Sequence, residues 1–133
     1  MVLETEILRI DAPGAPVRST IAAALVHDGI AYLSGILAAD YEGNLIGVGN
    51  PDEQAKACVD EIERVLLACG STLDDILRCT AYATSEEAAF AYIQERMGRM
   101  TKRPAATTVF VSKLLREGAM LEVEVIARVP QAC

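Results

Sequence analysis

The chain has 133 residues, of which 52% are hydrophobic, and its net charge is −7. This length predicts one domain, and an acidic chain without a lysine or arginine cluster is not expected to bind nucleic acid. The mean hydropathy of +0.27 is high for a small domain. Because no apolar run is long enough to cross a membrane, we expect the surplus apolar surface to be buried between the subunits of an oligomer.

Strands are predicted in the N-terminal part of the chain. Residues 1–10 form the first one, and they lack the basic start and cleavage site of a secretory signal, so we expect a cytoplasmic protein. The loop Ala12–Pro16 is rich in proline and glycine. The strands Ile21–Val26 and Ile30–Ile36 follow, joined at Asp28-Gly29, which is a strong signal for a hairpin.

A helix is predicted after the turn Tyr41–Asn44 and the segment Leu45–Val48. Asn50 can cap it, Pro51 suits the first helical position and Glu53 occupies the acidic position of a capping box. Gly70 is the expected terminator. The apolar residues recur at intervals of three and four, which predicts one buried face: Ala55, Cys58, Val59, Ile62, Val65, Leu66 and Cys69.

The second half of the chain predicts strands separated by another helix. Ile76–Ala83 is a strand in which Arg78 and Thr80 interrupt the apolar residues. The helix from about Glu86 to Met97 is capped by Thr84 or Ser85, and its apolar stripe consists of Ala89, Phe90, Ile93 and Met97. We expect Met97 and Met100 to fill the core rather than a ligand surface. The closing strands are Ala106–Val111 and Met120–Val129.

This order of elements predicts an α+β domain with one sheet and both helices on one of its faces. The other face then needs a cover, which again favours association. Four cysteines with a single histidine, and no Cys-x-x-Cys spacing, argue against a zinc site and a disulfide framework. We expect buried thiols, no metal and no cofactor.

Several segments, in order, resemble the RidA family, which is also called YjgF or endoribonuclease L-PSP. The resemblance covers about Ala12 to Arg128, and its segments are Tyr32–Gly35, Gln54–Ala57, Ala68–Ile76, Arg103–Val111 and Leu121–Ala127. Members of this family are small proteins that hydrolyse reactive enamines and imines. The resemblance implies a single domain over residues 1–133, with a chorismate-mutase-like fold of a mixed sheet and two helices. It also implies a homotrimer with small-molecule clefts between the subunits.

The family resemblance also exposes a missing charge. The family segment usually reads Pro-Ala-Arg-(Ser/Thr)-(Cys/Thr), and its arginine grips the carboxylate of the substrate. Ala106 stands at that position here, so a carboxylate would lose a charge-assisted, bidentate contact. Arg103 and Arg18 are the alternative cations, although a solvated surface residue is the more common role for each.

The resemblance implies the other site residues. Glu122 matches the acid that helps to position water, although the alternating Glu122 and Glu124 can also form a solvated strand face. Gly35 matches a close approach of the backbone to the ligand, or it simply ends a strand. The remaining positions of the predicted substrate-binding site are Ile21, Ile36, Ala106, Thr107 and Thr108; the two threonines can equally be strand filler.

Two functions remain open from the sequence. The first is a RidA-like enamine and imine hydrolase whose substrate range differs because the arginine is missing at Ala106. The second is a non-catalytic trimer that binds a small molecule or a partner protein in the same cleft. The residues alone do not name a substrate.

Overall fold

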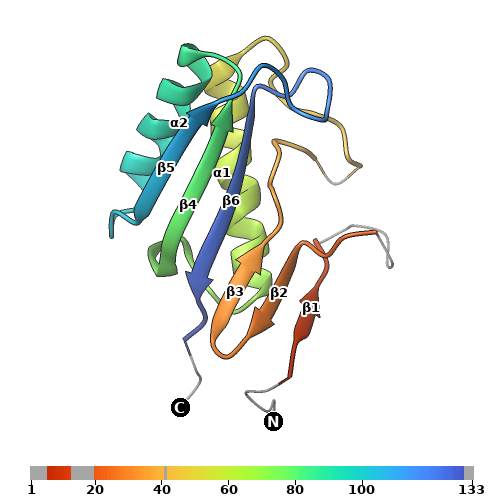
Figure 1. Cartoon of the computed structure of the whole chain (residues 1–133), viewed down its shortest axis with the longest axis vertical. Coiled ribbons are helices and arrows are strands. Elements are labelled where there is room, and N and C mark those ends of the chain that lie inside the picture. Colours follow the sequence, from red (N-terminus) through yellow and green to blue (C-terminus); the bar gives the residue numbers. More distant parts are fainter. Residues whose placement is uncertain (1–5, 13–19, 41, 131–133) are drawn as a thin grey trace.

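The computed structural model describes residues 6–12, 20–40 and 42–130. Within them, six strands form one sheet in the order β1-β2-β3-β6-β4-β5, in which only β4 and β5 run parallel. Both helices cover the same side of the sheet (Figure 1), which confirms the predicted α+β fold. The elements are β1 (Leu8–Ile10), β2 (Ala24–His27), β3 (Ile30–Leu33), α1 (Pro51–Ala68), a 3₁₀ turn (Leu73–Asp75), β4 (Ile76–Ala83), α2 (Glu86–Arg99), β5 (Ala105–Phe110) and β6 (Leu121–Arg128).

The hairpin of β2 and β3 has the predicted turn but shorter strands. Asp28 and Gly29 both have positive φ angles, 55° and 76°, as the favoured two-residue hairpin turn requires. β2 begins at Ala24 rather than Ile21, and β3 ends at Leu33 rather than Ile36. Beyond Leu33 the chain turns toward β6, where Ile36 forms an isolated bridge with Val123. The predicted loop Ala12–Pro16 falls mostly outside the described residues.

The helix α1 confirms most of its predicted signals. Asn50 accepts a hydrogen bond from the backbone N–H of Glu53, with Pro51 at the first helical position. The reciprocal half of the predicted capping box is not made, because the Asn50 N–H donates to the carbonyl of Gly47. At the other end Ser71 donates to Leu66, and Gly70, with φ of 80°, donates to Leu67. These two bonds form a Schellman motif.

The predicted apolar stripe of α2 is half wrong. Ser85 caps the helix as expected, but Phe90 and Met97 are 61% and 64% exposed. The buried side instead carries Ala88, Ala89 and Tyr92. The buried side of α2 thus combines alanines with one large aromatic residue, and Phe90 and Met97 lie outside it. Met100 is buried as predicted, whereas Met97 is not.

The core lies between the sheet and the two helices. The predicted apolar face of α1, from Ala55 to Cys69, is buried there, and so are the thiols of Cys58, Cys69 and Cys79. Gln54 and Ser71 are the buried polar residues of the described part of the chain, each 1% exposed. The side chain of Gln54 is fully hydrogen-bonded. Its Nε2 donates to the carbonyls of Ile46 and Gly118, and its Oε1 accepts from the N–H of Met120 at 2.6 Å. The Gln54 side chain therefore links α1 to the segment that precedes it, at Ile46, and to the segment that precedes β6, at Gly118 and Met120.

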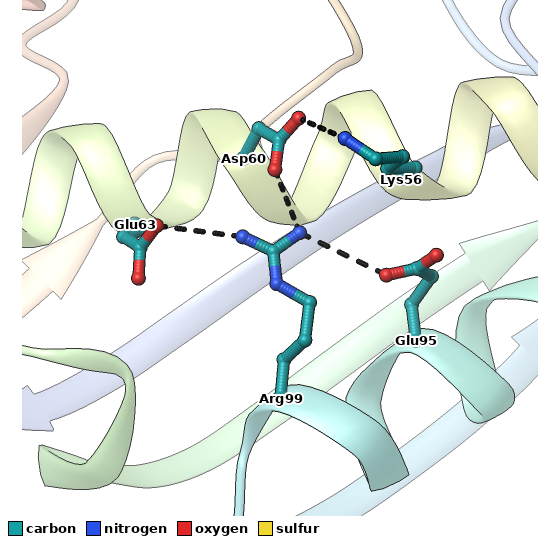
Figure 2. A network of polar contacts seen from close by, with 5 residues as sticks. All are labelled: Lys56, Asp60, Glu63, Glu95 and Arg99. Carbon is teal, nitrogen blue, oxygen red and sulfur yellow. Dashed lines mark hydrogen bonds and ion pairs between the residues drawn. The ribbon is translucent and has the colours of Figure 1, made fainter.

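A polar network joins the helices on their outer side (Figure 2). Arg99 of α2 pairs with Asp60 of α1 at 2.7 Å and with Glu63 at 3.4 Å. Lys56 contacts the other oxygen of Asp60, and Glu95 lies 3.8 Å from Arg99. One arginine of α2 thus bridges the two helices. In the described part of the chain, neither helix has the length and apolar character that spanning a membrane requires.

Candidate functional site

The sheet has two chemically different faces. The helix face is the one that α1 and α2 cover, and the open face is the other. β6 shows the alternation most clearly, because Leu121, Val123 and Val125 are buried, whereas Glu122 is half-buried and Glu124 exposed. The register places Ile126, Glu124 and Glu122 of β6 opposite Arg78, Thr80 and Tyr82 of β4. Paired residues of neighbouring strands point to the same side of a sheet, so these six residues share the open face.

Glu122 lies directly against Gly35. A Cβ atom added at Gly35 would come within 2.1 Å of Oε1 of Glu122, so a side chain at this position would displace the carboxylate from the place it has in the structure. Ser34 anchors this strand end, because its hydroxyl donates to the carbonyl of Ala22 at 2.7 Å. Burial and the neighbouring charge of Glu124 raise the pKa of Glu122. Glu122 is therefore a carboxyl group with a raised pKa that lies against the backbone of Gly35.

Two side-chain bonds organise the rest of the open face. The Tyr82 hydroxyl donates to Oε1 of Glu124 at 2.6 Å, and this bond raises the pKa of Tyr82. Nη2 of Arg78 donates to the hydroxyl of Thr107 at 2.5 Å. The first bond joins β4 to β6 and the second joins β4 to β5. The open face therefore carries two carboxylates, Glu122 and Glu124, on β6 and one cation, Arg78, on the neighbouring strand β4.

The residues predicted on β5 do not all share this face. Thr107 does, as its bond to Arg78 shows. Ala106 and Thr108 pair with Cys79 and Ala81, which belong to the helix face, so they share a side with each other but not with Glu122. Both lie on an edge strand that the helices only partly cover, and Ala106 is exposed. Within one chain, Ala106 and Glu122 are therefore on opposite faces.

The other predicted residues are divided as well. The side chain of Ile36 is buried in the core, so its backbone is the part that a ligand could contact. Ile21 is exposed and precedes β2, next to the Ala22 carbonyl that holds Ser34.

The alternative cation Arg103 lies in a turn with a φ of 54°, and it shares a surface hollow with Asp75 and Arg128. Arg128 ends β6 whereas Glu122 begins it, about 20 Å away along an extended strand. Arg18 is outside the described residues.

The polar side of β4 differs from the prediction. The sequence pattern predicts an apolar strand that Arg78 and Thr80 interrupt. In the structure Arg78, Thr80 and Tyr82 form one side of the strand, and the buried Cys79, Ala81 and Ala83 form the other. The sequence signal for this polar side is the alternation of polar and apolar residues from Arg78 to Ala83, because a period of two is typical of a strand with one exposed face.

Comparisons with known proteins agree on one family. Residues 10–129 match the family described as Endoribonuclease L-PSP. The RutC family protein UK114 of Drosophila melanogaster is 31% identical over 106 residues, which cover 78% of this chain and 75% of that protein. A crystal structure of the Rid family protein YyfA from Yersinia pestis is 29% identical with a TM-score of 0.83, over 93% of this chain and 100% of that one. The yeast protein YEO7 has the same fold at 22% identity, with a TM-score of 0.83 over 94% and 100% of the two chains.

Proposed function

The chain belongs to the endoribonuclease L-PSP family, also called RidA or YjgF, and on this basis we propose that it is a homotrimeric, cytoplasmic enamine and imine hydrolase. The observation that carries the proposal is the contact of Glu122 with Gly35. A carboxyl group with a raised pKa, held beside a strand end that has no side chain, is suited to holding water against a small planar substrate.

The reaction needs only one acid–base group and water. Glu122 accepts a proton from a water molecule while the oxygen of this water bonds to the carbon of the C=N group. The electron pair of the π bond moves to nitrogen. The carboxyl group then returns the proton to nitrogen. In the collapse of the carbinolamine, Glu122 takes the proton of the hydroxyl group and delivers it to nitrogen; the oxygen forms the C=O bond, the C–N bond breaks, and ammonia leaves a carbonyl compound behind. An enamine enters the same sequence after protonation on carbon gives the imine. A raised pKa favours such a shuttle, because the group both accepts and returns the proton more readily near neutral pH.

The division of the predicted residues supports a site between subunits. Ala106 and Thr108 lie on the partly covered edge strand β5, whereas Glu122 and Gly35 lie on the open face. Two copies of the chain can bring these groups together although one copy cannot. The open face also exposes apolar side chains, including Leu25 and Tyr32, which association would bury. Light scattering is expected to give the mass of a trimer, and a monomer at micromolar concentration would overturn this part of the proposal.

Restoring the missing charge tests the site. Ala106 is exposed, so Ala106→Arg can be accommodated, and its guanidinium fork matches a carboxylate. We expect the variant to release ammonia from 2-imino acids, made in place by an amino-acid oxidase, about tenfold to a hundredfold faster than the parent. Glu122→Ala in the same background should abolish the gain.

Ala105→Arg is the matched control, because Ala105 is also exposed but pairs with Arg78 and so lies on the opposite side of β5. It should bring no gain. If Ala106→Arg forms a folded trimer that neither binds 2-oxo acids nor hydrolyses imines, the cleft has lost catalysis. The alternative function, a trimer that binds a ligand or a partner without catalysis, is then favoured, because the family arginine is missing at Ala106.

A further inference from the structure

Gly35 lies on a short segment that follows β3, and a backbone anchor on each side fixes it. On one side the hydroxyl of Ser34 donates to the carbonyl of Ala22 at 2.7 Å. On the other side Ile36 exchanges two backbone hydrogen bonds with Val123, of 2.7 and 3.0 Å. The pair of Ile36 and Val123 is an isolated bridge, outside the ladder that joins β3 to β6. The position of Gly35 therefore depends on the few bonds made at this bridge.

Cys58 adds a third hydrogen bond at the same bridge. It lies in the middle of α1, and its Sγ donates to the carbonyl oxygen of Ile36 at 3.4 Å. That oxygen also accepts the N–H of Val123, so both of its lone pairs are used. The side chains of Cys58 and Ile36 are buried in the core. The contact is thus completed within one chain, on the side of the sheet that α1 covers, and does not depend on association.

The thiol of Cys58 remains a hydrogen-bond donor at neutral pH. Burial raises its pKa, and the charges of Glu122 and Glu61 raise it further. A protonated thiol donates to a carbonyl, whereas a thiolate has no proton to give. The influence of the Glu122 charge also means that the thiol and this carboxyl group lie near enough to interact.

We propose that Cys58 is a positioning residue of the site, and that its S–H bond to Ile36 holds Gly35 against the carboxyl group of Glu122. Gly35 and Ile36 are consecutive, so a shift of the Ile36 carbonyl moves the backbone against which Glu122 lies. A reacting group needs such support, since a displacement of about 1 Å can cost about a hundredfold in rate. The catalytic meaning of the contact rests on the proposed function, whereas the contact itself does not.

Three substitutions at Cys58 separate the hydrogen bond from packing. Cys58→Val removes the donor at a similar volume, Cys58→Ala removes it and leaves a small cavity, and Cys58→Ser keeps a donor. Cys69→Ala is the matched control, because it removes another buried thiol, at the C-terminal end of α1. Circular dichroism and light scattering establish that each variant folds and associates as the parent does.

Nuclear magnetic resonance gives two readouts. In Cys58→Val and Cys58→Ala, the amide hydrogens of Ile36 and Val123 should exchange about threefold to tenfold faster relative to those of β4, as expected for the loss of one hydrogen bond. The carboxyl carbon of Glu122 should titrate with a pKa closer to the ordinary value of glutamate, because water reaches the loosened carboxyl group more easily. Cys58→Ser and Cys69→Ala should leave both readouts near those of the parent.

Three results would overturn the proposal. One is that Cys58→Val and Cys58→Ala leave both readouts unchanged. Another is that Cys69→Ala changes them equally, which would assign the effect to packing. The third is that Cys58→Ser behaves like Cys58→Ala, which would exclude a role for the donor.

Ammonia release from imines is measured separately. If the parent hydrolyses imines, Cys58→Val should lower kcat more than it changes KM, and Cys58→Ser should restore it. A parent without this activity overturns the proposed function, whereas exchange and the Glu122 titration still decide whether Cys58 positions Gly35. The two failures therefore remain distinguishable.

Discussion

On the helix face of β6, Val123 and Val125 are buried among apolar residues of the same chain, whereas on the open face of that strand Glu122 and Glu124 lie beside Tyr82 and Arg78. The helix face is thus completed within one chain and is almost wholly apolar. The open face keeps ionisable groups, and a single chain does not cover it. Substitutions on the helix face should therefore act mainly on stability, and those on the open face mainly on binding and proton affinity.

The largest effect is expected from placing a charge on the helix face. Val123→Asp buries a carboxylate without a partner in a fully covered position, so we expect the free energy of unfolding to fall by about 4 kcal/mol or more. Glu124→Gln, the next residue on the open face, should change it by less than about 0.5 kcal/mol. Urea unfolding measures both. Similar effects of the two substitutions would show that the faces do not differ in this way.

A smaller effect is expected at the buried polar residue Gln54 of α1. Gln54→Leu keeps a side chain of similar size but removes the bonds to Ile46, Gly118 and Met120. The backbone groups left without partners should cost about 2–3 kcal/mol. Gln94→Leu, at an exposed position of α2, is the control and should cost less than about 0.5 kcal/mol. Equal midpoints in urea for Gln54→Leu and the parent would mean that water replaces those bonds.

The smallest effect concerns the pH dependence of the open face. Burial and Glu124 raise the pKa of Glu122, so between its unfolded and folded pKa the native chain binds more protons than the unfolded chain. The stability from this group is complete in acid, below the unfolded pKa, and is lost as the pH rises through the folded value.

Glu122→Gln cannot ionise, so it should be slightly more stable than the parent at pH 7 and indistinguishable from it below about pH 4. Urea unfolding at the two pH values measures this difference. Glu117→Gln, at an exposed loop position, serves as the control. If the free energy of unfolding of the parent rises relative to that of Glu122→Gln as the pH increases, the sign of the effect is contradicted.

Much of the fold was predictable because its signals are local. Asn50, Pro51 and Gly70 delimit α1 through caps that depend on neighbouring backbone groups, and Asp28-Gly29 fixes the hairpin turn in the same way. The face of α2 was not predictable from its apolar residues, since contacts with distant segments bury Tyr92 and the alanines and leave Phe90 and Met97 exposed. Gly35 and Glu122 are predicted from the family segments, whereas their contact with each other is visible only in the structure.

By itself the sequence determined the family, the order of elements and the alternation within each strand, because periodicity and turn chemistry are properties of neighbouring residues. It also showed that the arginine of the family is missing at Ala106. Only the tertiary structure decided which alternating residues meet. The pairing of β4 with β6 places Tyr82 beside Glu122 and Glu124, and the pairing of β4 with β5 turns Ala106 away from Glu122. Strand order and register depend on contacts between distant segments, and a shift of one residue moves every side chain to the other face.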